Sequence, residues 1–162
     1  TQKPAQKKLV ETVISLFPLY QRLEEEARHY DDAPELLCHY DARPENIFPS
    51  ENKTRPRGDF GLAKPGTPEF DLGKMEQVKM GKYVKAYVFF RNALEQEQDE
   101  NIELSGKDAN ELEQRAMNIG FLNAMRIACF KISKGADATR HVRLARAYGN
   151  VLEQQSGNWR CG

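Results

Sequence analysis

The chain has 162 residues, and its 24 Lys and Arg balance 24 Asp and Glu, so the formal net charge is zero. This balance gives no electrostatic reason to expect nucleic acid or a membrane surface as the partner. Three widely spaced cysteines without a CxxC pair argue against a disulfide framework or a zinc site, and they favour a reducing, cytoplasmic location. The length predicts a single domain over residues 1–162 with a real core, and no apolar run is long enough for a membrane span.

The first predicted element, within residues 1–35, is a helix from Lys7 to about His29. Pro18 interrupts its pattern and predicts either a bent helix or two joined pieces. The residues before Lys7 are polar and basic and lack the apolar core of a secretion signal. The chain does not begin with Met, so we expect a processed or excised piece. The apolar stripe of the helix has a helical period and consists of Leu9, Val10, Val13, Ile14, Phe17, Tyr20 and Leu23.

Residues 36–73 are rich in Pro and Gly, which predicts loops, turns and at most short strands. This segment also concentrates acidic and amide side chains between two helical regions. Loops on a rigid scaffold are where chemistry usually sits. The polar positions fall in three runs, which are His39-Tyr40-Asp41-Ala42-Arg43-Pro44-Glu45-Asn46, Asp59-Phe60-Gly61 and Gly66-Thr67-Pro68-Glu69-Phe70-Asp71-Leu72.

The spacing of His39, Asp41 and Asn46 resembles the His-x-Asp-x-x-x-x-Asn catalytic loop of kinase-like phosphotransferases. Thirteen residues after the Asn, Asp59-Phe60-Gly61 resembles their Asp-Phe-Gly element. The run from Gly66 to Leu72 is similar to the Gly-Asp-Pro-x-x-Asp-Leu run of the aminoglycoside phosphotransferase and choline kinase branch. The chain therefore resembles the carboxy-terminal lobe of these enzymes, with motifs over residues 36–73.

The resemblance implies transfer of the ATP gamma-phosphate to a hydroxyl of a small molecule or protein, with Mg-ATP as cofactor. Asp41 would accept the proton of the acceptor hydroxyl, and His39 would brace the same catalytic loop by hydrogen bonds. Asn46 and Asp59 would bind the magnesium ion and, through it, the nucleotide. Hard oxygen ligands of this kind suit Mg²⁺.

The resemblance carries further expectations for the neighbouring residues. Residues 35–38 would form a short strand that delivers His39, and Asp71 would be structural, tying the following helix to the catalytic loop. Tyr40 stands where the small-molecule kinases usually have Gly. The 38 residues before His39 contain no Gly-rich phosphate loop. We therefore expect a missing amino-terminal lobe or a partner chain, without which the domain would be incomplete or inactive.

The residues alone leave a second interpretation open, because Asp, Asn, Gly and Pro occur in any surface loop. The chain can instead be a non-enzymatic helical protein that self-assembles, or that binds a partner or nucleic acid through an arm at residues 41–73. Cys38 is interpreted as a small buried hydrophobe. The basic cluster of Lys53, Arg55 and Arg57 is interpreted as a solvated loop, since no aromatic platform is interleaved with it. The two functions differ in geometry, because a kinase needs Asp41, Asn46 and Asp59 to converge on one metal-sized pocket.

Residues 74–155 are predicted to form a helical bundle, followed by a tail at residues 156–162. A first helix, from about Leu72 to Gln98, has so many aromatics on one face that we expect it to pack deeply. That face consists of Met75, Val78, Tyr83, Ala86, Tyr87, Phe90 and Leu94.

The next helix is predicted from Ala109 to Ile132, with Asp108 as its cap and Gly120 as a point of close approach. Its centre, residues 117–130, is apolar nearly all round and should be the most buried element. Gly135 ends it.

Asp137 or Thr139 begins the last helix, whose outer face has a basic stripe at Arg140, Arg143 and Arg146. Its predicted inner face consists of Val142, Leu144, Ala145, Tyr148, Val151 and Leu152. The predicted fold class is mainly α, α+β at most, with four or so helices in a bundle-like lobe and a long central loop or short hairpin region.

Overall fold

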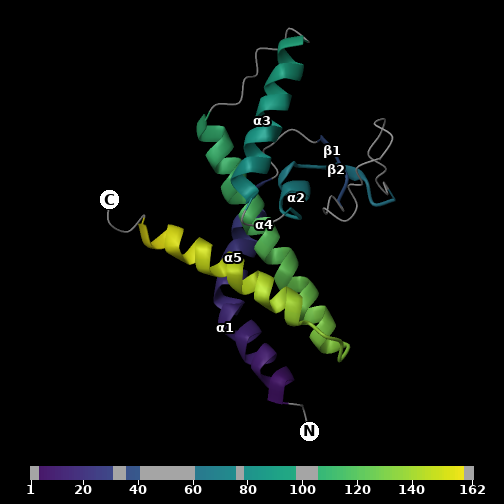
Figure 1. Ribbon diagram of the computed structural model, residues 1–162, viewed down its shortest axis with the longest axis vertical. Helices are drawn as coiled ribbons and strands as arrows, with labels where there is room; N and C mark the ends of the chain where they lie inside the picture. The colour runs from purple at the N-terminus through teal and green to yellow at the C-terminus, as the bar shows by residue number, and fades with distance from the viewer. Residues whose placement is uncertain (1–3, 31–35, 41–60, 76–78, 98–105, 159–162) are drawn as a thin grey trace. The chain divides into compact units, whose positions relative to one another are not determined.

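The structure is a computed structural model that describes residues 4–30, 36–40, 61–75, 79–97 and 106–158. It is mainly helical, as predicted, with one small two-stranded sheet (Figure 1). No helix in the described ranges combines the length and apolar character that crossing a membrane requires. The elements in chain order are α1 (Pro4–Ala27), β1 (Leu36–Cys38), β2 (Lys64–Gly66), α2 (Glu69–Leu72), α3 (Met80–Glu97), α4 (Gly106–Ser133) and α5 (Thr139–Asn158).

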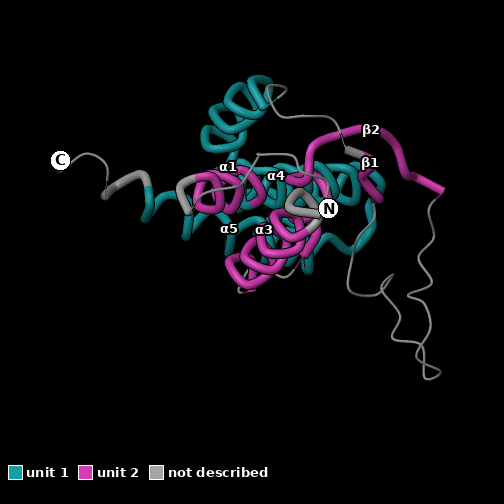
Figure 2. The backbone as a smooth tube through the Cα atoms, turned by 90° about the horizontal axis from the view of Figure 1, so that it is seen from above, with its two compact units in different colours: residues 1–30, 117–162 teal, residues 31–116 magenta. Residues whose placement is uncertain are grey.

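The chain divides into two compact units (Figure 2). The first unit combines residues 1–30 with residues 117–162, and the second comprises residues 31–116. The boundary between them falls inside α4, so one continuous helix contributes to both units. The single domain over residues 1–162 stays a prediction.

In the first unit, α1 packs against α5. Pro18 lies inside α1, which is one continuous helix rather than two pieces. The predicted stripe is wrong at Ile14 and Phe17, which are exposed. Val13 and Leu23 of the predicted stripe are buried, together with Leu16 and Leu19 outside it, because a period of 3.6 does not by itself decide between two adjacent apolar rows. This buried row consists of Val13, Leu16, Leu19 and Leu23.

The prediction that the centre of α4 is deeply buried is confirmed from Ala116 to Met125. It is wrong for Ile127, Cys129 and Phe130, which are exposed. Because Ala128 is fully buried among them, only one side of these last turns is covered. The predicted Asp108 cap is also wrong, because α4 begins at Gly106 and Asp108 already lies within its first turn.

Gly120 of α4 permits the close approach that its position predicts. A Cβ added there would lie 2.5 Å from Cζ of the buried Tyr148 in α5. After α4, Gly135 adopts a φ of 66°, and the next residue donates its N–H to the carbonyl of Lys131. This is the glycine cap that was predicted. Oδ1 of Asp137 then accepts the N–H of Thr139, which is the first residue of α5.

In the second unit, β1 and β2 pair in antiparallel register, with Leu36 opposite Gly66 and Cys38 opposite Lys64. The strand predicted before His39 is therefore confirmed. The helix predicted from Leu72 to Gln98 instead begins at Met80, and Leu72 is the last residue of the short helix α2.

The buried side of α3 also differs from the predicted face. Met80 and Val84 are almost fully buried, whereas Ala86 and Phe90 are exposed. Apolar residues occur on two sides of this helix, and the pattern cannot show which side packs inward.

Candidate functional site

The β1–β2 ribbon brings together two segments that are distant in the sequence. Cys38, the last residue of β1, pairs with Lys64, the first residue of β2. In an antiparallel pair, the chain leaving β1 at His39 therefore lies beside the chain that enters β2. The first of these leads to Asp41, and the second comes from Asp59. Asp41, Asn46 and Asp59 themselves lie outside the described residues.

Asp71 in α2 binds the backbone that follows β1. Its Oδ2 accepts the N–H of His39 and its Oδ1 accepts the N–H of Tyr40, both at 2.7 Å. Hydrogen bonds to a carboxylate are stronger than those between neutral groups. These two contacts confirm that Asp71 binds the segment at His39, although it does so from within the short helix α2 and not from the start of the longer helix that was predicted to follow it. The same contacts place His39 through its backbone N–H, directly after β1.

Tyr40 adopts a left-handed backbone conformation, with a φ of 60°. Among the described residues it is the only non-glycine with a positive φ. A side chain in this region costs roughly 1–2 kcal/mol, and glycine is the residue that tolerates it. This conformation explains why glycine would suit the position. Such strain persists only where the surrounding structure over-determines it.

Several contacts hold Tyr40 in place. Nζ of Lys74 donates to the carbonyl of Tyr40 at 2.7 Å. The ring stacks on Phe70 with centroids 5.2 Å apart, and Nζ of Lys64 lies 4.3 Å from the centroid. A side chain at Gly66 would collide with the same ring. Both the backbone and the side chain of Tyr40 are therefore fixed, directly before Asp41.

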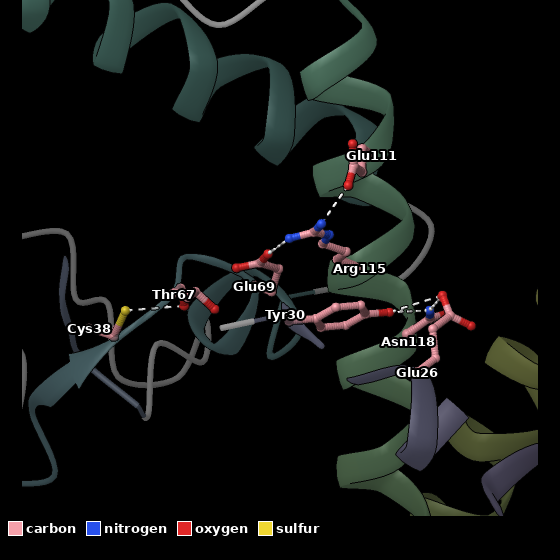
Figure 3. A network of polar contacts seen from close by, with 8 residues as sticks. All are labelled: Glu26, Tyr30, Cys38, Thr67, Glu69, Glu111, Arg115 and Asn118. Carbon is pink, nitrogen blue, oxygen red and sulfur yellow. Dashed lines mark hydrogen bonds and ion pairs between the residues drawn. The ribbon is translucent and has the colours of Figure 1, made fainter. Parts of the chain in front are cut away.

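The helix that carries Asp71 is anchored by a buried ion pair (Figure 3). Glu69 is 2% exposed, and its Oε1 lies 3.5 Å from Nη1 of Arg115. Arg115 also pairs with Glu111 one turn earlier in α4. A buried carboxylate needs such a partner, because removing the partner leaves an uncompensated charge. Arg115 thereby stabilises the position of α2, and with it that of Asp71.

Two buried oxygens beside this ion pair, Oε2 of Glu69 and Oγ1 of Thr67, have no hydrogen-bond partner within the described part of the chain. Unsatisfied buried polar atoms are uncommon in folded proteins. Thr67 lies in the turn before α2, and Glu69 is the first residue of that helix.

Cys38 is a buried, unreactive thiol. Its side chain is 3% exposed, and Sγ donates to the carbonyl of Thr67 at 3.2 Å. Burial raises the pKa of Cys38 to about 11, and the negative charges of Asp71 and Glu69 contribute to that rise. A thiol with this pKa is a poor nucleophile at neutral pH. The prediction of a small buried hydrophobe is confirmed.

A second polar network lies in the first unit, where α1 ends (Figure 3). Nδ2 of the fully buried Asn118 donates to Oε1 of Glu26 and to the hydroxyl of Tyr30. Tyr30 also donates to Glu26. These three residues hold the turn that follows α1. Their hydrogen bonds give the buried side-chain amide of Asn118 its partners.

No group of three or more His, Cys, Asp or Glu in the described ranges could hold a metal ion. The candidate magnesium ligands, Asn46 and Asp59, belong to the residues that are not described. The sequence did not indicate the roles of Lys64, Lys74 or Arg115. For Lys74 alone, the sequence contained a usable signal. It follows Asp71 by three residues, and residues three apart are neighbours on a helical turn.

Comparisons of the chain with protein-family models, with curated proteins and with solved structures found no match.

Proposed function

We propose that the chain is the catalytic lobe of a kinase-like phosphotransferase that transfers the gamma-phosphate of ATP to a hydroxyl acceptor. Asp41 is the residue that orients the acceptor hydroxyl and takes its proton. Asn46 and Asp59 hold Mg²⁺, which neutralises charge on the nucleotide phosphates. One observation carries this proposal, the pair of hydrogen bonds that the N–H groups of His39 and Tyr40 donate to the carboxylate of Asp71.

These hydrogen bonds support catalysis because phosphoryl transfer depends on positioning. Asp41 follows Tyr40 directly, so whatever fixes the backbone of Tyr40 restricts where Asp41 can lie. Tyr40 has a left-handed backbone conformation that a carboxylate and a lysine hold by hydrogen bonds. A loop that only contacts solvent does not require such a conformation. Backbone strain of this kind clusters at functional sites.

The strand pairing supports the convergence of the acidic residues. Asp41 lies three residues after Cys38, and Asp59 lies five residues before Lys64, which is the partner of Cys38 in the ribbon. An extended chain spans at most about 3.6 Å per residue, so these short tethers allow the two carboxylates to meet, and their convergence is part of the proposal. Carboxylate and amide oxygens are ligands that suit Mg²⁺.

His39 takes the bracing role that the resemblance implies. Its backbone N–H is one of the two groups that Asp71 binds, and the residue is half-buried. The proposal therefore assigns the proton to Asp41 alone. The Gly-rich phosphate loop and the nucleotide-binding Lys of kinase-like enzymes would be supplied by an amino-terminal lobe or a partner chain.

The proposal is tested by measuring ADP formation from ATP and Mg²⁺ with a panel of hydroxyl acceptors, including aminoglycosides and small amino alcohols. We expect Asp41→Asn to lower the rate at least 100-fold, because it removes the group that accepts the proton. Asp108→Asn is the matched control, since it makes the same change at an exposed position of α4. Equal rates for Asp41→Asn and the unaltered chain would leave the non-enzymatic helical protein as the better account.

A further inference from the structure

Helix α2 and the turn after it hold the backbone of Tyr40 from both sides. The carboxylate of Asp71 accepts the N–H of Tyr40, and Nζ of Lys74 donates to its carbonyl, each at 2.7 Å. The N–H of Lys74 also donates to the carbonyl of Asp71 at 3.1 Å, so the two side chains belong to one short piece of backbone. Any shift of α2 therefore moves both groups that hold Tyr40.

The position of α2 depends in turn on Arg115 of α4. Glu69 is the first residue of α2 and is buried, and its Oε1 lies 3.5 Å from Nη1 of Arg115. A buried carboxylate that loses its cationic partner is strongly destabilised. Asp71 follows Glu69 by two residues within the same four-residue helix. Arg115 therefore acts on Tyr40 through the two carboxylates of α2.

Arg115 is shared between two carboxylates, and Figure 3 shows its guanidinium between them. Its Nη2 lies 2.5 Å from Oε1 of Glu111, which stands one turn earlier in α4. The side chain of Glu111 is 52% exposed, whereas that of Glu69 is 2% exposed. The guanidinium thus makes its shorter contact with the exposed carboxylate and its longer contact with the buried one.

The carboxylate of Glu69 can accept more than it receives. Its Oε2 is buried and has no hydrogen-bond partner within the residues that the structure describes. A guanidinium can bind one carboxylate through two parallel N–H···O bonds, which is the strongest arrangement of this pair. Glu69 does not have this arrangement with Arg115, because Nη2 is directed to Glu111 instead. Glu111 therefore competes with Glu69 for the same guanidinium.

We propose that Arg115 is a positioning residue of the phosphotransferase site and that Glu111 limits its effect. Removing the charge of Glu111 releases Nη2 to bind Oε2 of Glu69, which fixes α2 and the segment leading to Asp41 more tightly. Removing Arg115 has the opposite effect. The two residues of α4 therefore control, in opposite directions, how firmly that segment is held. The effect on catalysis rests on the proposed function, whereas the effect on the segment does not.

Amide hydrogen exchange of the full chain at His39 and Tyr40 tests the positioning. Glu111→Gln should slow exchange at both amides about 3–10-fold, because the two-bond pair of Arg115 with Glu69 opposes local opening. Arg115→Met should make exchange at both amides about 10–100 times faster, because it leaves a buried charge without its partner. Glu111 is exposed, so Glu111→Gln keeps the test decisive even where Arg115→Met does not fold.

Two controls show whether the effect passes through Glu69. The double variant E69Q/E111Q should exchange as Glu69→Gln alone does, because Arg115 then has no second carboxylate to bind more tightly. Glu11→Gln makes the same change as Glu111→Gln in an exposed ion pair of α1, with Lys7. It should change exchange at the two amides by less than about twofold, since an exposed pair of this kind contributes little.

Steady-state ADP formation tests the effect on catalysis. Glu111→Gln should raise kcat about 2–5-fold and Arg115→Met should lower it about tenfold, because phosphoryl transfer depends on positioning. KM for Mg-ATP should stay within about twofold in both variants, since neither residue is a proposed ligand of the nucleotide or the metal. A loss of folded protein lowers the active fraction, but it does not raise kcat above that of the unaltered chain.

Three results would overturn parts of this account separately. Exchange at His39 and Tyr40 that Glu111→Gln leaves unchanged, or that E69Q/E111Q still slows relative to Glu69→Gln, would refute the positioning by Arg115. Slower exchange in Glu111→Gln without a higher kcat would refute its effect on catalysis. Equal rates of ADP formation by Asp41→Asn and the unaltered chain would instead refute the proposed function, and the exchange rates would still decide the positioning.

Discussion

The carboxylate of Asp71 accepts the backbone N–H of Tyr40 at 2.7 Å, although the two residues are 31 positions apart in the sequence. This contact joins helix α2 to the end of strand β1, where Tyr40 holds a left-handed conformation. Because the ion pair of Glu69 with Arg115 anchors α2, the position of Tyr40 depends on a contact with α4 as well.

Replacing Asp71 with Asn should loosen the segment that leads to Asp41. The amide has a single acceptor oxygen, so one of the two N–H groups of His39 and Tyr40 would face the NH₂ group instead. A hydrogen bond to a charged group contributes about 1.5–3 kcal/mol. We expect amide hydrogen exchange at these two residues to become about 10–100 times faster. Unchanged exchange rates, equal to those of Asp108→Asn, would show that the contact has little effect on the segment.

The strain at Tyr40 can be measured by comparing Tyr40→Gly with Tyr40→Ala. Both variants lose the stacking on Phe70 and the contact with Lys64. Only Ala retains a Cβ at a φ of 60°, which costs roughly 1–2 kcal/mol. We expect Gly to give a free energy of unfolding at least equal to that of Ala, the reverse of the order in an ordinary helix. Urea unfolding measures the free energy of unfolding of both variants. Ala147→Gly in α5 is the comparison, because in an ordinary helix the Ala protein is the more stable. An Ala variant that is more stable than the Gly variant would contradict the left-handed conformation.

Alkaline pH should destabilise the fold through two buried groups. Burial raises the pKa of Cys38 from 9.0 to about 11 and the pKa of Tyr148 from 10.0 to about 12. Above pH 9 the unfolded chain loses protons that the folded chain keeps, so stability is complete below pH 9 and falls as pH rises through 11 and 12. Each group contributes a loss of about 1–3 kcal/mol.

Urea unfolding at pH 8 and pH 10.5 measures this loss. Cys38→Ala should reduce the difference between the free energies of unfolding at the two pH values. It removes the buried thiol, whose pKa is lower than that of Tyr148. Cys129→Ser, at an exposed position, should leave the difference unchanged. A difference that is the same in all three proteins would rule out the titration of Cys38 as its cause.

Local patterns predicted much of the fold. Helical periodicity located α1, α4 and α5, and Gly135 indicated where α4 ends, because a glycine after a helix favours the left-handed cap. The motif at Asp71 predicted its link to the segment at His39. These features depend on neighbouring residues or on a known motif.

The remaining features depend on contacts between distant residues. Glu69 and Arg115 pair across 46 positions, and a single sequence gives no signal for such a partner. The left-handed conformation of Tyr40 results from Asp71, Lys74 and Phe70 together, against the usual preference of a tyrosine. Phe90 was predicted to be buried, because periodicity detects an apolar face without showing whether the protein itself covers it.

The most direct test of the proposed function is a calorimetric titration of the purified chain with ATP, with and without Mg²⁺. We expect saturable binding at one site that requires Mg²⁺ and that Asp59→Asn weakens at least tenfold, because the carboxylate is a proposed metal ligand. Asp108→Asn should bind as the unaltered chain does. ATP binding that does not require Mg²⁺, or that Asp59→Asn leaves unchanged, would contradict the assignment of this chain as a kinase-like phosphotransferase lobe.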